Sequence, residues 1–176
     1  MQQPAILIVP GLGNSGPEHW QTHWEHHYGY LRVQQHDWDC PIQADWVQTL
    51  EDAIAAAGPD VVLVGHSLGC ITIAHWAGTT QHRIKGALLV APADVDRSDM
   101  PPEVVNFAPI PLARLPFPSI VVASTTDEYM TLERAQQLAQ AWGSRFVNVG
   151  ALGHINSESG LGLWPEGHAL LQDLVG

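Results

Sequence analysis

The sequence predicts a three-layer α/β domain in which helices cover both faces of a mostly parallel sheet of about six strands. Two observations support this prediction. Several short apolar runs rich in β-branched residues are hydrophobic without alternation, which is typical of strands buried on both faces. Stretches with apolar residues at helical spacing separate these runs, and this alternation favours right-handed crossovers between parallel strands. With 176 residues, we expect the whole chain, 1–176, to form one domain.

The expected elements alternate along the chain. The strongest strand candidates are residues 5–9, 61–64, 87–91 and 120–123, and weaker candidates are 31–36 and 145–149. Helices are expected at residues 17–28, 44–57, 68–79, 131–142 and 165–175. In the second of these, Trp46, Leu50 and Ile54 recur at helical spacing, and Gly58-Pro59 ends the pattern.

The segment 92–118 interrupts the alternation. It contains seven prolines, too many for a regular helix, although residues 103–107 fit a single turn. We expect an irregular excursion over the strand ends, with Met100, Phe107 and Phe117 lining a pocket.

Charge and cysteine content exclude several classes of partner. Lys plus Arg number 7 and Asp plus Glu number 18, so the formal net charge is −11. Such an acidic surface repels phosphate backbones and anionic membranes, which argues against nucleic-acid and membrane partners. The chain starts without a basic region, and the apolar run 5–9 is too short for the core of a signal peptide, so we expect a cytoplasmic protein. Cys40 and Cys70 indicate neither a disulfide framework nor a zinc site, and we expect both to be buried thiols.

A candidate nucleophile directly follows a strong strand candidate. The segment Gly65-His66-Ser67-Leu68-Gly69 fits the pattern Gly-x-Ser-x-Gly. In this motif the glycines let strand and helix pack closely around a strained turn that exposes the serine hydroxyl at a helix N-terminus. The pattern alone is weak evidence, but the strand before it and the apolar helical stretch after it supply the required context. We interpret Ser67 as a nucleophile, with helix capping as the alternative.

A serine nucleophile needs a histidine to take its proton and a carboxylate to orient that histidine, here in the chain order Ser, acid, His. His154 follows the last strand candidate in a glycine-punctuated loop and is the expected base. Two acids follow strand candidates, Asp127 after 120–123 and Asp94 after 87–91. We favour Asp127, because its loop runs straight into a helix, whereas Asp94 opens the proline-rich excursion.

The oxyanion of a tetrahedral intermediate needs backbone donors. We expect these to be the amides of Leu68 and of Leu12, which lies in the glycine-rich loop 10–16 after the first strand. That loop also suits a dinucleotide, but no acidic residue ends a second strand about twenty positions later unless Asp37 serves. We therefore expect no cofactor.

A pair of histidines raises the question of a metal. His19 and His23 share a helix face at spacing i, i+4. The Glu of the pattern His-Glu-x-x-His is missing and no third ligand is evident. A structural role for this stripe of aromatic and imidazole rings is therefore favoured, and we expect no metal.

These motifs resemble those of the retinoblastoma-binding protein nine / YdeN-like family of small serine hydrolases, within the α/β-hydrolase superfamily. The matching segments span nearly the whole chain, at residues 9–15, 19–21, 24–25, 65–69, 124–129, 153–156, 160–162 and 164–167. The resemblance implies a triad of Ser67, Asp127 and His154, and a sheet in the order 2-1-3-4-5-6 without a lid domain. Family members often have a proline beside the acid. Here Asp127-Glu128-Tyr129 has none, which leaves Glu128 as a neighbouring carboxylate to exclude.

Together, the residues predict a serine hydrolase that cleaves small acyl esters, or alternatively amides, through an acyl-enzyme on Ser67. The expected partner is a small acyl substrate. Without a long lid, we expect a shallow pocket. The main alternative is a hydrolase-fold module that binds or regulates a protein with little turnover, because a fold alone does not settle function. Acyl transfer or carbon–carbon bond cleavage by the same residues is a further enzymatic alternative.

Overall fold

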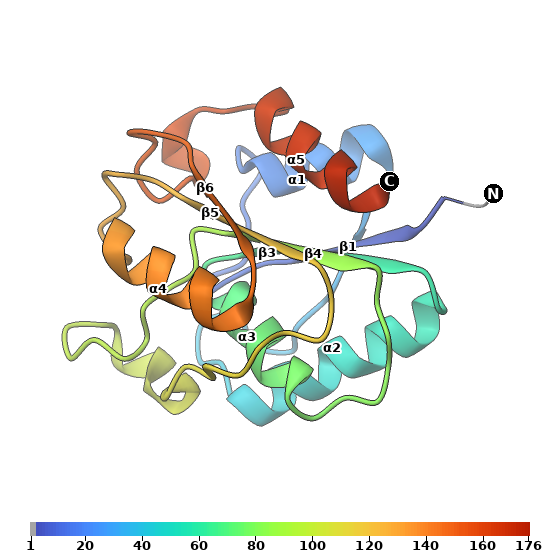
Figure 1. Ribbon diagram of the computed structural model, residues 1–176, viewed down its shortest axis with the longest axis horizontal. Helices are drawn as coiled ribbons and strands as arrows, with labels where there is room; N and C mark the ends of the chain where they lie inside the picture. The colour runs from blue at the N-terminus through green and yellow to red at the C-terminus, as the bar shows by residue number, and fades with distance from the viewer. Residues whose placement is uncertain (1–2) are drawn as a thin grey trace.

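A six-stranded parallel sheet lies at the centre of the computed structural model, which describes residues 3–176 (Figure 1). The strands are β1 (Ala5–Val9), β2 (Leu31–Arg32), β3 (Val61–His66), β4 (Gly86–Val90), β5 (Ser119–Ala123) and β6 (Arg145–Asn148). Their order is β2-β1-β3-β4-β5-β6, and all neighbours are parallel, which confirms the predicted sheet. The first two positions of the expected domain, 1–176, lie outside the described residues.

Helices cover both faces of the sheet, as predicted. They are α1 (Trp20–Tyr28), α2 (Gln43–Ala57), α3 (Leu68–Ala77), α4 (Leu132–Trp142) and α5 (Pro165–Val175), with short 3-10 helices η1 (Pro102–Phe107) and η2 (Ser157–Ser159). Helices α1 and α5 lie on one face, and α2, α3 and α4 lie on the other (Figure 1). The fold therefore has three layers.

The two faces of the sheet bury two separate apolar clusters. In β1, Ile6 and Ile8 pack on the side of α1 and α5, whereas Leu7 and Val9 pack on the side of α2, α3 and α4. Successive side chains of a strand point to opposite faces, so a strand covered on both sides must be apolar throughout. This explains why the strands appear in the sequence as continuous hydrophobic runs.

The largest differences from the expected element lengths occur at α1 and β2, which are both shorter than predicted. Helix α1 begins at Trp20 rather than at residue 17, because His19 forms its N-cap and accepts the backbone N–H of Gln21 at Nδ1 (3.1 Å). Strand β2 contains only two residues of the expected 31–36, although the amide of Val33 still donates to the Ile8 carbonyl (2.9 Å).

The proline-rich excursion connects β4 to β5 and includes η1. Met100 lines the cavity beside Ser67, as expected. Phe107 and Phe117 were wrongly assigned to that cavity. Both are buried in the core, where Phe107 packs against the ring of Trp46 and Phe117 against that of Trp76. No separate lid domain occurs within residues 3–176.

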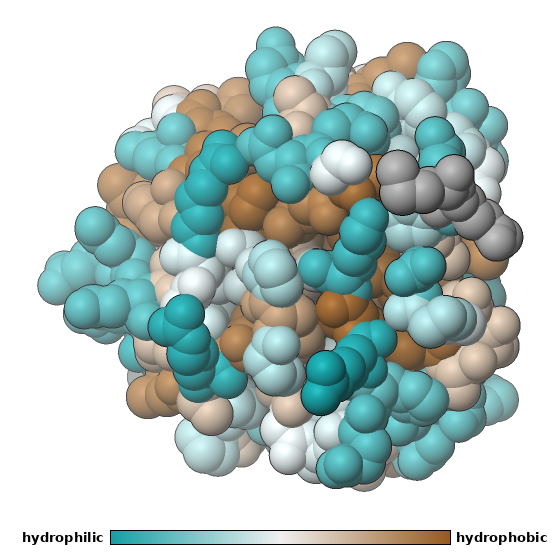
Figure 2. All heavy atoms as spheres, turned by 45° about the vertical axis from the view of Figure 1, so that its right-hand side comes forward, coloured by the Kyte–Doolittle hydropathy of each residue, from teal (hydrophilic) through white to brown (hydrophobic). Residues whose placement is uncertain are grey.

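The surface is largely hydrophilic on the face seen in Figure 2, with apolar side chains visible in the hollows between polar ones. Within the described part of the chain, no helix combines the length and apolar character needed to cross a membrane. Cys70 is buried as expected, but Cys40 is exposed, because it lies in the loop that precedes α2.

Candidate active site

Ser67 lies on a tight turn between β3 and α3. Its backbone adopts φ 54° and ψ −122°, an unusual conformation for a residue other than glycine. The flanking glycines explain how the turn fits: a Cβ on Gly69 would collide with the carbonyl oxygen of Val9, and one on Gly65 would lie 2.8 Å from Ile73 Cδ1. The Ser67 side chain makes no capping hydrogen bond to α3, so the capping alternative is wrong.

The Ser67 hydroxyl is directed at His154 instead. Ser67 Oγ lies 2.8 Å from His154 Nε2, and His154 Nδ1 lies 2.9 Å from each carboxylate oxygen of Asp127. The His154 and Asp127 side chains are 8% and 2% exposed. An N–H at Nδ1 donating to Asp127 leaves Nε2 of the neutral ring free to accept a proton from the serine. The structure thus brings together the three residues that the sequence places far apart.

Hydrogen bonds from backbone amides to side-chain hydroxyls join the loop of Asp127 to the loop of His154. The amide of Leu152 donates to Ser124 Oγ and that of Gly153 donates to Thr126 Oγ1, both at 2.9 Å. Within the first loop, the amide of Tyr129 donates to Asp127 Oδ1 (2.9 Å). No role for Ser124 or Thr126 was predicted from the sequence, although the hydroxyl-rich run 124–126 directly after a strand is a visible signal.

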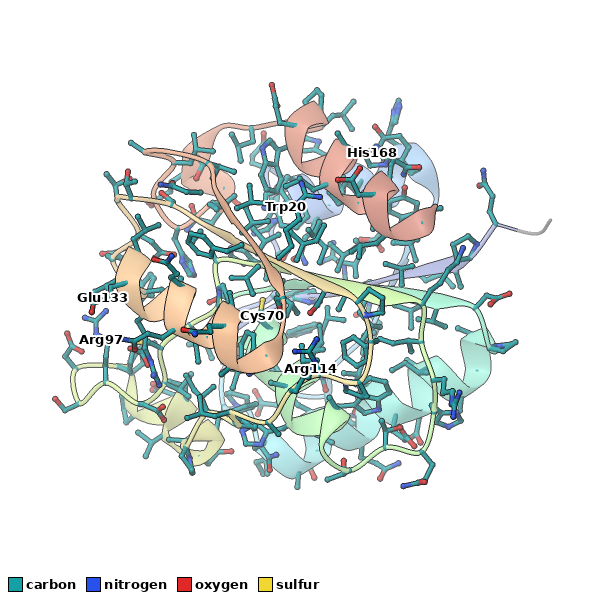
Figure 3. All side chains as sticks on the ribbon, viewed as in Figure 1. Trp20, Cys70, Arg97, Arg114, Glu133 and His168 are labelled. Carbon is teal, nitrogen blue, oxygen red and sulfur yellow. The ribbon has the colours of Figure 1, made fainter. Side chains whose placement is uncertain are left out.

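The other candidate carboxylates, those of Asp94 and Glu128, make no hydrogen bond to His154 among the described residues. Asp94 lies after β4, but its Oδ1 is 3.5 Å from Arg134 Nε, and no hydrogen bond to His154 is found among the described residues. The backbone carbonyl of Glu128 accepts a hydrogen bond from Arg97 (2.7 Å; Figure 3), and it is the carboxylate of Asp127, not that of Glu128, that meets His154 Nδ1. The preference for Asp127 over its neighbours therefore agrees with the geometry.

The two expected oxyanion donors lie in segments that pack against each other. A Cβ on Gly11 would lie 3.0 Å from Ser67 Cβ and 3.1 Å from the amide nitrogen of Leu68, so the loop after β1 closely approaches the nucleophile. Leu12 and Leu68 both line the cavity beside Ser67. Leu68 is also the first residue of α3, where the partial positive charge of the helix N-terminus favours a nearby anion.

A cavity of about 430 Å³ opens beside Ser67 and His154. Its apolar wall includes Met100 and Val104 from the excursion. Glu128 and Glu158 also line it, and the described lining residues include no Lys or Arg. The cavity therefore combines an apolar wall with two acidic residues.

Two further histidines lie close to the ring of His154 and also line the cavity. His66 Nε2 is 2.9 Å from the backbone carbonyl oxygen of His154, and the two rings are 4.9 Å apart. The ring of His19 contacts the ring of His66 edge-on at 4.6 Å. Burial lowers the pKa of His19 to about 3, assisted by the charge of Arg32, and burial lowers the pKa of His66 well below its usual value. Both rings are therefore neutral at pH 7.

The metal alternative receives no geometric support from His19: Nδ1 accepts the Gln21 amide, so the neutral ring carries its proton on Nε2 and has no free lone pair for a metal. Among the described residues, no group of three or more His, Cys, Asp or Glu side chains is arranged to hold a metal ion.

The sheet order, the serine on a strand-to-helix turn and the hydrogen-bonded histidine define the class of protein: a serine hydrolase with an α/β-hydrolase fold. The chain belongs to the serine hydrolase family, whose pattern matches residues 6–173. A comparison with curated proteins found no match.

Solved structures agree with this assignment. A protein described as a YdeN-like hydrolase from Pectobacterium atrosepticum is 36% identical, with a TM-score of 0.88 over 99% of this chain and 91% of that one. The ydeN gene product of B. subtilis is 21% identical (TM-score 0.78, 97% and 98% of the two chains). Est1E from Butyrivibrio proteoclasticus is 14% identical (TM-score 0.74, 99% and 90%). The last two show likeness of fold alone.

Proposed function

We propose that this serine hydrolase cleaves small acyl esters through an acyl-enzyme on Ser67, with amides as alternative substrates. The single observation that carries the proposal is the continuous hydrogen-bonded chain from Ser67 Oγ through the His154 ring to Asp127. A hydroxyl becomes a useful nucleophile when a neighbouring base takes its proton, and the base is effective when a carboxylate fixes its tautomer.

The proposed reaction has two steps. In the first, His154 Nε2 accepts the Ser67 proton while Oγ attacks the ester carbonyl carbon, and the same nitrogen then protonates the departing alcohol. In the second, a water molecule gives its proton to His154 and attacks the acyl carbon; the bond to Oγ then breaks, His154 returns the proton to Oγ, and the carboxylic acid is released. The amides of Leu12 and Leu68 are the proposed donors to the negatively charged oxygen of each tetrahedral intermediate.

The cavity supports a preference for small substrates. Its volume of about 430 Å³ is at the lower end of the range for small-molecule sites. Residues from the excursion and from the loop of Glu158 wall it, and it holds an acyl group next to Ser67 without a lid domain. We propose short, uncharged acyl chains as the substrate class.

A fluorophosphonate probe combined with ester hydrolysis tests the proposal, because only an activated serine reacts with the probe. We expect labelling at Ser67 and turnover of short-chain p-nitrophenyl esters, both abolished by Ser67→Ala. Such a change lowers kcat by about 10⁶-fold in other triads. A folded wild-type protein that neither labels nor hydrolyses a graded series of esters would instead favour the alternative of a hydrolase-fold module that binds or regulates a protein.

A further inference from the structure

The residue after the catalytic histidine adopts a strained backbone conformation. Ile155 has φ 48°, in the left-handed region that β-branched residues rarely occupy, and its side chain is fully buried. The loop around it contains Gly150 and Gly153, both also at positive φ, so its local sequence does not enforce a single backbone path. A strained residue of this kind persists only where its surroundings hold it in place.

Two ring N–H groups hold the backbone on either side of Ile155. His66 Nε2 lies 2.9 Å from the carbonyl oxygen of His154, which belongs to the peptide preceding Ile155. Trp20 Nε1 donates to the carbonyl oxygen of Ile155 itself (2.8 Å). Since the two acceptors flank the φ and ψ angles of Ile155, the two bonds together fix its conformation.

Both donors are rigidly placed. Trp20 is 1% exposed and lies in the layer between the sheet and the helices α1 and α5 (Figure 3). His66 directly precedes Ser67 in the chain. Its hydrogen bond to the His154 carbonyl therefore links the backbone of the base to the residue next to the nucleophile. The rings of Trp20 and His66 also meet edge-to-face at 6.1 Å.

The chemistry of the acceptor fixes the protonation of His66. A carbonyl oxygen only accepts hydrogen bonds, so Nε2 of His66 must carry a proton. Burial lowers the pKa of His66 well below its usual value, so Nδ1 is unprotonated and the ring is uncharged. An uncharged ring supplies the hydrogen bond without placing a second positive charge beside His154 when the latter becomes an imidazolium during catalysis.

We propose that His66 and Trp20 are positioning residues that clamp the strained His154–Ile155 backbone and thereby hold the catalytic imidazole between Ser67 and Asp127. The inference rests on the proposed esterase function and adds to it two residues that act through the backbone of the base rather than on the reacting atoms. Loss of either bond allows Ile155 to relax towards a common backbone conformation, which turns the preceding peptide and displaces the imidazole.

A matched pair of tryptophan variants tests the clamp. Trp20→Phe removes the N–H donor to Ile155, whereas Trp24→Phe removes an equally buried indole of α1 that donates to the Leu163 carbonyl (2.7 Å), away from the base. We expect Trp20→Phe to lower kcat for a short p-nitrophenyl ester by about 10- to 100-fold with KM changed less than about 3-fold, because small misplacements of a catalytic group cost up to about 100-fold. For Trp24→Phe we expect kcat for the same ester to stay within about 3-fold of the wild-type value.

A second pair of variants tests the histidine. In His66→Gln an amide N–H takes the place of Nε2–H, whereas His66→Leu fills part of the space without a donor. We expect His66→Leu to lower kcat as Trp20→Phe does, and His66→Gln to recover most of the loss. Equal impairment of the two His66 variants, wild-type kcat in a folded His66→Leu, or equal losses for the two tryptophan variants would overturn the proposal. If His66→Leu does not fold, the tryptophan pair decides alone.

A proton NMR measurement separates failure of the clamp from failure of the proposed function. The proton shared by His154 Nδ1 and Asp127 gives a low-field resonance that requires no turnover. We expect this resonance in wild type, Trp24→Phe and His66→Gln, and its loss or broadening in Trp20→Phe and His66→Leu. A wild type that shows the resonance but fails to label or hydrolyse esters would reject the function alone. An undisturbed resonance in Trp20→Phe and His66→Leu would reject the clamp.

Discussion

Asp127 presents both carboxylate oxygens to Nδ1 of His154, each at 2.9 Å, and its side chain is only 2% exposed. A carboxylate held in this way stabilises the imidazolium that forms when the ring takes a proton from Ser67. This hydrogen bond also fixes which ring nitrogen faces Ser67. Because the N–H at Nδ1 points at Asp127, the unprotonated Nε2 faces the serine.

Replacing the acid by its amide should therefore remove most activity while keeping the shape of the site. In Asp127→Asn, the amide group can donate to Nδ1 and so stabilise the wrong tautomer of His154, and we expect kcat to fall by about 10⁴-fold. Steady-state ester hydrolysis measures the loss. Asp94→Asn is the matched control, because Asp94 faces Arg134, and its activity should remain close to that of wild type. A large loss of activity in Asp94→Asn, with near-wild-type activity in Asp127→Asn, would reverse the assignment of the acid.

The pH dependence of activity should show one protonation step. The base must be neutral to accept the serine proton, so we expect kcat/KM to rise with pH along a single ionisation. Burial lowers the pKa of His19 to about 3 and that of His66 well below its usual value, so neither should contribute a step near neutral pH. A flat profile between pH 5 and 8 would argue against His154 as the base.

Lowering the pH should destabilise the fold, because the buried ring of His19 excludes a proton. Burial, with a contribution from the charge of Arg32, lowers the pKa of His19 from 6.5 to about 3, so the unfolded chain binds a proton that the folded chain excludes. The contribution of His19 to the free energy of unfolding is fully present above pH 6.5 and is lost as the pH falls towards 3. We expect the free energy of unfolding in urea to decrease over this window, and to decrease less steeply in His19→Asn, which keeps a capping oxygen for α1. Equal slopes for the two proteins would contradict this.

The packing of Gly69 against β1 should make the nucleophile turn intolerant of side chains. A methyl group at position 69 would collide with the carbonyl oxygen of Val9. This oxygen belongs to the backbone and cannot move aside as the end of a flexible side chain could. We expect Gly69→Ala to destabilise the protein by at least about 1–3 kcal/mol, the usual cost of overpacking, and to lower the midpoint of thermal unfolding accordingly. Gly16→Ala is the control for stability, because a Cβ there meets nothing within 4 Å. Similar midpoints for the two variants would refute the packing argument.

The carboxylates of Glu128 and Glu158 should make the enzyme sensitive to substrate charge. Both line the cavity, so an ester with a cationic alcohol group should be favoured over its anionic counterpart of the same size. We expect Glu158→Gln to reduce this ratio of kcat/KM values by about 2- to 5-fold, because exposed charge pairs contribute about 0.2–1 kcal/mol. Salt should reduce the wild-type ratio in the same way. Glu133→Gln, on α4 and outside the cavity lining, should leave the ratio unchanged (Figure 3).

Much of the fold follows from local patterns in the sequence. The strands at residues 5–9 and 61–64 were evident because burial on both faces requires continuous apolar residues. Helix ends were less predictable: α1 starts at Trp20 because the imidazole of His19 caps it, a role that the sequence pattern did not indicate. The position of Phe107 was also predicted wrongly, for a different reason: an apolar residue in a proline-rich segment is equally compatible with lining a pocket and with packing in the core.

The sequence alone determined the alternation of strands and helices, the serine turn, and the chain order of nucleophile, acid and base, because these are encoded by residue type and spacing within short segments. Only the tertiary structure decided which carboxylate meets His154, and that His66 and Trp20 hold the backbone beside it. Those relationships join residues up to 135 positions apart, and they depend on loop paths that no local pattern specifies.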